Sequence, residues 1–208
     1  MPDRLVRDFP LFPLALVALP SELIPLHIFE ERYKTMMNDC LQSEREFGIL
    51  WMSDEGLREN GCACEIDRVL ERLDDGRINI LTRGTRPFRV LERREHLPYP
   101  AATVEFLDDR DETIDETLLG TVRQVYADLV KRVTDRVPDT EELAAMGAYA
   151  MAAKVDFGLD AKQGLLDLRS ENARLRLVMR LFRAALKRLD FVDRAQARAR
   201  SNGKVRFN

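Results

Sequence analysis

The sequence holds little of the chemistry on which most enzymes depend. It has two histidines and three cysteines among its 208 residues. It has neither a G-x-S-x-G nucleophile motif nor the G-x-x-x-x-G-K-[ST] loop that binds phosphates. Cys62 and Cys64 are separated by a single residue, whereas zinc ligand pairs usually have gaps of about two to four residues and need a second pair. We therefore predict no catalytic residues, no metal site and no cofactor, which favours a binding module over an enzyme.

Long apolar runs and an excess of one charge are also missing. The net charge is −3, from 33 basic and 36 acidic side chains, so bulk charge selects no class of partner. No run approaches the roughly 20 apolar residues of a membrane span. The first 21 residues superficially resemble a secretory leader, but Asp3 and Asp8 interrupt its basic region and Pro10 and Pro13 would break its helix. With an odd number of cysteines, we expect a cytoplasmic protein that does not bind membranes.

The first half of the chain has the pattern of a β structure. Apolar and alternating runs predict strands, and "DDG" between two of them predicts a hairpin. These strands are expected at 11–19, 47–52, 61–73, 77–84, 86–95 and 101–107. One helix is expected after Pro25, because Phe29, Tyr33, Met36 and Cys40 recur at helical spacing. We predict a small barrel or strongly coiled sheet, with one inserted helix, over residues 1–110.

The second half changes to a helical period. One apolar stripe is formed by Ile114, Leu118, Val122, Val125 and Leu129. Asp139 with Glu142 resembles a capping box for a second helix, residues 159–168 fit a short third helix, and Ser170 could cap a long fourth one. We predict a helical bundle over 111–192 and a basic, frayed tail over 193–208, which gives an α+β protein.

Charge is unevenly distributed in this second half. Residues 169–206 hold twelve basic and three acidic side chains, whereas residues 105–160 hold six basic and fourteen acidic ones. Neighbouring helices of opposite charge would neutralise each other within a bundle. Alternatively, Arg174, Arg180, Arg183 and Lys187 could form a basic face for an acidic partner or for RNA phosphates. The interleaved aromatic residues that single-strand binding usually needs are absent there, which makes nucleic acid the less favoured partner.

Several segments together resemble a known family. "FPLFPLALVALPSELIPLHIFEERYKTMM", "FGIL", "GCACEIDRVLERLDDGRINILTRGTRPFRVLE" and "PYPAATVEFLDD" are similar, in order and spacing, to the N-terminal substrate-recognition domain of Lon-type ATP-dependent proteases over residues 9–109. The helices beyond residue 112 are similar in kind. The most specific residues of this signature are Pro25, His27, Phe29, Glu30, Arg32, Tyr33, Gly76, Arg77, Gly84, Phe88 and Arg89.

The resemblance implies both a fold and a function. The fold would be a PUA-like pseudobarrel followed by a helical bundle. The function would be non-enzymatic binding of unfolded or degron-bearing proteins, or an adaptor role in quality control beside a Lon protease or other proteolytic machinery. Because the 208 residues contain neither the ATPase nor the peptidase module, we expect a stand-alone domain protein without ATPase or protease activity; a homodimer is compatible with it. The alternative is an RNA-binding PUA-like protein that uses the basic C-terminal helix.

Binding would use a groove or apolar patch for extended peptide, or a free sheet edge. The candidate residues are Phe12, Leu23, Trp51 and Met52, large apolar side chains near the ends of predicted strands. Each of them could instead belong to the core. A salt-insensitive interaction with unfolded proteins would separate this function from RNA binding, whose affinity falls with salt.

The segment 24–37 is interpreted as the corner piece of the barrel. We expect Pro25 to end the strand region, Glu30 to pair with Lys34 across one helical turn, and Phe29 to join the core with the following helical residues. His27 is expected to bond to the backbone, with direct ligand contact as the alternative. A hydrolase would instead need a nucleophile beside His27.

One departure from the family concerns a turn. Ser21 stands in "LPS", where the family usually has Pro-Gly. A serine lacks the freedom of glycine at positive φ. The sequence therefore does not determine whether this turn has the backbone conformation that is usual in the family.

Overall fold

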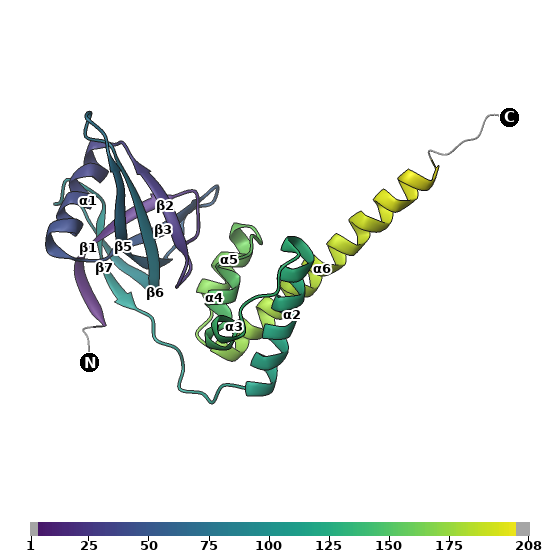
Figure 1. The fold of residues 1–208 in the computed structure, drawn as a ribbon. Helices are drawn as coiled ribbons and strands as arrows, with labels where there is room; N and C mark the ends of the chain where they lie inside the picture. The colour runs from purple at the N-terminus through teal and green to yellow at the C-terminus, as the bar shows by residue number, and fades with distance from the viewer. Residues whose placement is uncertain (1–3, 203–208) are drawn as a thin grey trace. The chain divides into compact units, whose positions relative to one another are not determined.

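The strands of the first half close into a barrel (Figure 1). The computed structural model describes residues 4–202. Its strands are β1 (Leu5–Leu14), β2 (Leu23–Ile28), β3 (Phe47–Ser53), β4 (Gly56–Leu57), β5 (Asn60–Arg72), β6 (Ile78–Arg94) and β7 (Ala101–Phe106). The strand order is β1-β7-β6-β5-β3, and a parallel pairing between β1 and β3 closes the ring. This arrangement confirms the predicted pseudobarrel.

The hairpin of β5 and β6 is confirmed, but β6 is longer than predicted. Gly76 has a φ of 81° at its tip, which explains the glycine there. A break was expected between residues 84 and 86, yet β6 runs through both Gly84 and Pro87. Gly84 is needed for a close approach rather than for a turn, because a Cβ there would lie 2.1 Å from the Leu19 carbonyl oxygen.

β2 is a strand that the sequence interpretation missed. Residues 23–28 pair antiparallel with residues 78–83 of β6. The expectation that Pro25 ends the strand region is therefore wrong. In the described part of the chain β2 pairs with β6 alone, and an edge strand tolerates a proline because one row of its backbone groups needs no partner strand.

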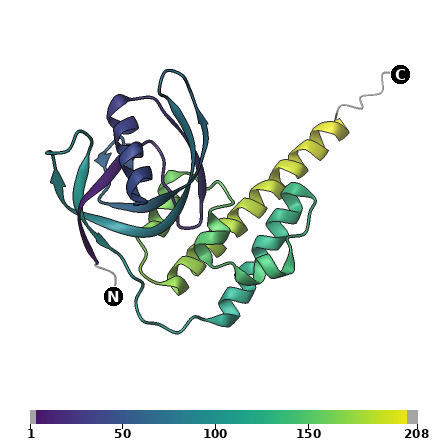
Figure 2. The same cartoon turned by 60° about the vertical axis from the view of Figure 1, so that its left-hand side comes forward.

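α1 (Glu31–Ser43) lies against the barrel, as Figure 2 also shows. Tyr33, Met36, Met37 and Cys40 are buried at helical spacing, as predicted. Phe29 is 60% exposed, so its expected place in the core is wrong. The helix begins at Glu31, and Phe29 therefore precedes the helical periodicity that would have turned it inward.

An aromatic cluster fills another part of the barrel. The ring of Phe9 contacts Phe88 and Phe106 edge to face, with centroid distances of 5.4 and 5.6 Å. The surrounding buried residues are Leu11, Leu50, Ala63, Ala102 and Val104. Phe88 of the family signature therefore has a packing role.

The helices of the second half are α2 (Glu116–Thr134), α3 (Thr140–Ala145), α4 (Ala148–Ala152), α5 (Leu159–Leu166) and α6 (Glu171–Asn202). Asp139 caps α3, as expected, by accepting bonds from the backbone N–H groups of Glu141 and Glu142. A single helix was predicted after Asp139, but the structure has two short helices, α3 and α4. In α2 the buried residues are Leu119, Val122, Tyr126 and Leu129, so only part of the predicted stripe faces inward.

The described residues form two compact units, 4–112 with 149–171 and 113–148 with 172–202. This grouping differs from the predicted single bundle over 111–192. α5 joins the first unit because its side chains bond to the barrel: Gln163 Nε2 donates to the Asn60 carbonyl over 3.2 Å, and Lys162 pairs with Glu22. The helical periodicity of the sequence predicts the apolar face of α5, but it does not predict the polar residues of the barrel to which α5 bonds.

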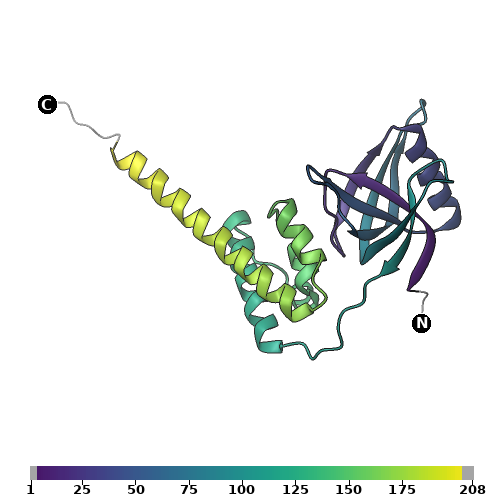
Figure 3. The ribbon, with the colours of Figure 1, turned by 180° about the vertical axis from the view of Figure 1, so that it is seen from behind.

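In the second unit α2 and α6 lie side by side (Figure 3). The rings of Tyr126 and Phe182 are 5.6 Å apart, and Arg123 Nε donates to the Met146 carbonyl over 3.0 Å. α6 continues through the first part of the predicted tail as far as Asn202, so fraying stays a prediction; 203–208 lie outside the described residues. None of the helices described within residues 4–202 is long and apolar enough to cross a membrane.

Candidate functional site

The outward face of β2 exposes an unusual set of side chains. Burial alternates along the strand, so Ile24, Leu26 and Ile28 face the core while Leu23, Pro25 and His27 face outward. Leu23 is 47% exposed. Because β2 is an edge strand, these side chains stand beside backbone groups that no other described strand pairs with.

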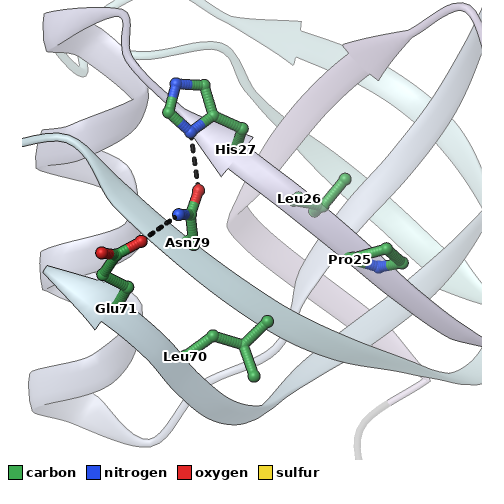
Figure 4. Close-up of a pocket in the computed structure, with 6 residues that line it drawn as sticks. All are labelled: Pro25, Leu26, His27, Leu70, Glu71 and Asn79. Atoms are coloured by element: carbon green, nitrogen blue, oxygen red, sulfur yellow. Dashed lines mark hydrogen bonds between the residues drawn. The ribbon is translucent and has the colours of Figure 1, made fainter.

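A cavity of about 480 Å³ lies between β2 and the β5–β6 hairpin (Figure 4). Its apolar walls are Pro25, Leu26 and Leu70, of which Leu70 is 53% exposed. Its polar wall is formed by His27, Glu71 and Asn79. The cavity therefore combines apolar surface with a small number of polar groups, as ligand sites commonly do.

Hydrogen bonds fix the orientation of the polar wall. Glu71 can only accept, so Asn79 donates Nδ2–H to Glu71 Oε2 over 2.8 Å and turns its own oxygen toward His27. His27 Nδ1 lies 2.6 Å from Asn79 Oδ1 and must carry the proton. The expected bond from His27 to the backbone is therefore wrong, because its partner is a side chain across the strand pair. As Figure 4 shows, Nε2 points away from this chain of bonds.

Phe29 extends the apolar surface beyond the cavity. Its ring is stacked beside that of His27, with centroids 5.8 Å apart and planes at 26°. We call Leu23, Pro25, His27, Phe29 and Leu70 together the β2 surface. Exposed apolar groups gathered in this way around ordered polar ones are typical of docking sites. The six cavity-lining residues include no serine, threonine or cysteine, so the hydrolase interpretation has no nucleophile beside His27.

The cysteines are placed for packing rather than for chemistry. Cys40, Cys62 and Cys64 are all free and buried. Burial raises the pKa of Cys40 to about 11. A hydrogen bond with Cys62, together with burial, raises the pKa of Cys64 well above its usual range. Both groups stay protonated thiols at neutral pH, and a thiol in this form is a weak nucleophile and metal ligand.

The four predicted peptide-binding residues have different environments. Phe12 is buried, and its ring lies 4.2 Å from that of Tyr33, so it cannot touch a ligand at the surface. Leu23 belongs to the β2 surface. Met52 is 47% exposed and Trp51 is half-buried, both on β3 where it pairs with β4.

Phe29 and Leu70 were missed as candidates. The alternating pattern of "LIPLHI" was the available signal for an exposed strand face, but the proline obscured it. Leu70 lay within a predicted strand, where one of the two faces must point outward.

Several charged residues of the signature form ion pairs with neighbouring side chains. The Arg32 guanidinium lies 4.6 Å from the centroid of the Tyr33 ring and pairs with Glu30 at 2.8 Å. The predicted pair of Glu30 with Lys34 is replaced by Glu31 with Lys34, at 2.5 Å. Two further arginines form surface pairs, Arg77 with Asp75 at 2.7 Å and Arg89 with Glu105 at 2.9 Å. Pro25, His27 and Phe29 are exposed as well, and they are the signature residues that belong to the β2 surface.

The turn at Ser21 has the conformation that a glycine would favour. Ser21 has a φ of 71°, in the left-handed region. Its backbone N–H donates to the Gly84 carbonyl over 2.8 Å, and Gly84 N–H donates to the Glu22 carbonyl over 2.9 Å. These two bonds hold the serine in that conformation and position the start of β2.

Comparison with known proteins identifies the family of this chain. The model of the ATP-dependent protease La (LON) substrate-binding domain matches residues 8–184. The chain belongs to this family. Lon proteases of Anaeromyxobacter dehalogenans (strain 2CP-C) and Bacillus subtilis (strain 168, Lon protease 1) are each 25% identical to it, over 207 and 197 residues. These alignments cover 89% and 86% of the chain but only 24% and 25% of the two proteases, so the chain spans about a quarter of their length.

Two solved structures show a similar fold. A Lon N-terminal domain protein from Xanthomonas campestris matches with a TM-score of 0.63 and 24% identity, over 84% of this chain and 98% of that one. The N-terminal domain of a Mycobacterium avium complex Lon protease matches with a TM-score of 0.60 and 17% identity, over 85% and 98%. Both support the α+β architecture described above.

Proposed function

We propose that the chain is a non-enzymatic substrate-recognition module that holds extended apolar segments of unfolded proteins on the β2 surface. The observation that carries this proposal is the exposure of Leu23, Phe29 and Leu70 around the ordered His27. Membership of a substrate-binding domain family supports it. We also propose an adaptor role, in which bound clients pass to a Lon protease or other proteolytic machinery. We expect this role to be performed in the cytoplasm.

The geometry favours an extended client. β2 pairs only with β6 among the described strands, so an incoming segment could add to its other edge by main-chain hydrogen bonds. Apolar side chains at alternate positions of that segment would then lie on the β2 surface. This mode of binding depends little on client sequence, which suits the recognition of unfolded chains.

The RNA-binding alternative receives no support from the helices. Arg174, one of four residues predicted for a basic face, is only 2% exposed. On the described part of α6, Asp190 and Asp193 both pair with Arg132 of α2. These two ion pairs neutralise acids of α6 rather than its basic side chains, so the mutual neutralisation of the two helices that the charge pattern suggests stays a prediction.

A binding assay with a permanently unfolded protein tests the proposal. A reduced, carboxymethylated and fluorescently labelled protein should bind the wild-type chain with an anisotropy change that persists at high salt. Phe29→Ser and Leu70→Ser should each weaken binding about 5- to 30-fold, the range for losing a partly buried apolar anchor. Phe191→Ser is the matched control, because Phe191 is 73% exposed on α6. Equal affinities for all variants, or binding lost with added salt, would contradict the proposal.

A further inference from the structure

A second cavity, of about 390 Å³, lies in the first compact unit beside β1, β4 and the segment that joins β6 to β7. Its volume is within the range of ligand pockets, roughly 300–1,000 Å³. Most of its lining residues are apolar. Pro13, Leu57 and Leu97 are half-buried and Pro98 is exposed, so these walls keep surface that a ligand could cover.

The charged side chains of this cavity are mainly basic. Arg32, Arg93 and Arg94 line it, and Glu95 is the one acid among the described lining residues. Two of the arginines, Arg32 and Arg94, each pair with a neighbouring glutamate, at 2.8 and 3.0 Å. Arg93 is exposed, and its side chain has no ion-pair or hydrogen-bond partner within residues 4–202. Because a guanidinium presents a planar fork of N–H donors that fits a carboxylate, Arg93 is available to an anionic ligand.

The segment that joins β6 to β7 is fixed at several points. Tyr99 is buried, and its hydroxyl donates to Asp39 Oδ2 of α1 over 2.9 Å. The Pro100 carbonyl accepts from Leu11 N–H of β1 over 2.8 Å. The rings of Pro98 and Pro100 further restrict the backbone. A ligand would meet a wall that is already ordered, so binding would lose little conformational entropy there.

We propose that this cavity binds the C-terminal residue of a client protein whose last side chain is apolar. The terminal carboxylate bonds to the guanidinium of Arg93, and the apolar side chain lies against Pro13, Leu57 and Leu97. A terminal residue carries both groups on one carbon atom, so one small cavity can hold them together. An ammonium group would face a cavity lined by three arginines, and an uncharged apolar group would leave Arg93 unpaired.

This subsite rests on the proposed function and adds to it a preference for one end of the client. Leu57 pairs with Met52 across the β3–β4 hairpin, and Met52 is 47% exposed. The residues that precede the terminus could therefore contact Met52 and Trp51, both predicted as peptide-binding residues. The β2 surface keeps its role for extended segments.

The first test uses a small probe, so that it does not depend on binding of an unfolded client. N-acetyl-leucine is titrated into the ¹⁵N-labelled chain, and the backbone amide signals of Leu57, Arg93 and Leu97 are followed by NMR. Saturable shifts are expected. N-acetyl-leucinamide lacks the carboxylate and N-acetylglycine lacks the apolar side chain, so each should bind about tenfold more weakly.

Arg93→Gln tests the contact with the carboxylate. This change removes the charge but keeps a polar side chain, and it should weaken binding of N-acetyl-leucine about tenfold, the usual effect of losing a hydrogen bond to a charged group. Arg72→Gln is the matched control, because Arg72 is also an exposed strand arginine without a side-chain partner within residues 4–202, and it does not line this cavity. Absent shifts, equal affinities for the three probes, or equal effects of the two variants would overturn the proposal.

The second test uses the unfolded client. A carboxymethylated client that ends in leucine is compared with the same client carrying a C-terminal amide, which should bind about tenfold more weakly. Unchanged affinity would overturn the subsite while leaving the β2 surface intact. If binding weakens only when internal acidic residues are replaced, the assignment to a chain terminus is overturned. If N-acetyl-leucine binds but no unfolded protein does, the proposed function fails and the subsite stands.

Discussion

Gly84→Ala should destabilise the barrel more than any ordinary Gly→Ala change. The new Cβ would lie 2.1 Å from the Leu19 carbonyl oxygen, and the two atoms must separate to at least the 3.4 Å of an ordinary contact. That shift of about 1.3 Å exceeds what the hydrogen bonds at Ser21 N–H and Gly84 N–H, 2.8 and 2.9 Å long, can absorb. Losing two backbone bonds at this turn costs about 3 kcal/mol.

Urea unfolding measures this loss. Trp51 is the only tryptophan and lies in the barrel, so its fluorescence reports the first compact unit. With an m-value of about 1.5–2 kcal/mol/M, the urea midpoint should fall by about 1.5–2 M. Gly120→Ala is the control: a Cβ at Gly120 meets nothing within 4 Å, and alanine in a helix should stabilise α2 by about 0.5–1 kcal/mol, seen by circular dichroism. A decrease in the free energy of unfolding below about 1 kcal/mol for Gly84→Ala would refute the reasoning. Residues 19–22 would then be able to shift away from the new Cβ at little cost.

Three further predictions concern the same unit. Ser21→Gly should raise the free energy of unfolding by about 0.5 kcal/mol, because it removes the strain of a positive φ; an unchanged urea midpoint would contradict this. Iodoacetamide at pH 8 should leave the native cysteines unmodified and alkylate all three in urea, as mass spectrometry would show; fast labelling of Cys40 would contradict its burial. Burial raises the pKa of Tyr99 to about 12, and a bond to Asp39 adds to this. The native state therefore keeps this proton when the unfolded state loses it, so stability should fall between about pH 10 and 12. Tyr99→Phe should show a shallower fall.

The sequence predicted those parts of the fold that repeat at a regular spacing. Tyr33, Met36 and Met37 were placed correctly because an apolar stripe defines a helix face. β2 was missed because a proline normally interrupts strands, and only the pairing with β6 shows that Pro25 lies on a tolerant edge. Phe29 was predicted to face the core as part of the helical stripe, but α1 begins only at Glu31, so the helical spacing does not apply to Phe29.

The candidate sites were harder to predict, because they depend on residues far apart in the sequence. The bond between His27 and Asn79 joins residues 52 positions apart, and that between Tyr99 and Asp39 joins residues 60 apart. No local pattern reveals such contacts. The turn at Ser21 did have a local signal, because a serine stands there in place of the glycine that the family usually has, and Ser21 has a positive φ.

Photo-crosslinking tests the central claim, binding of unfolded protein at the β2 surface, most directly. A benzoylphenylalanine introduced in place of Phe29 is illuminated with the carboxymethylated client, and the same group in place of Phe191 serves as the comparison. The account predicts a covalent adduct from position 29 at both low and high salt, with little from position 191. Equal yields from the two positions, or no adduct from position 29 while the client is still bound, would contradict it.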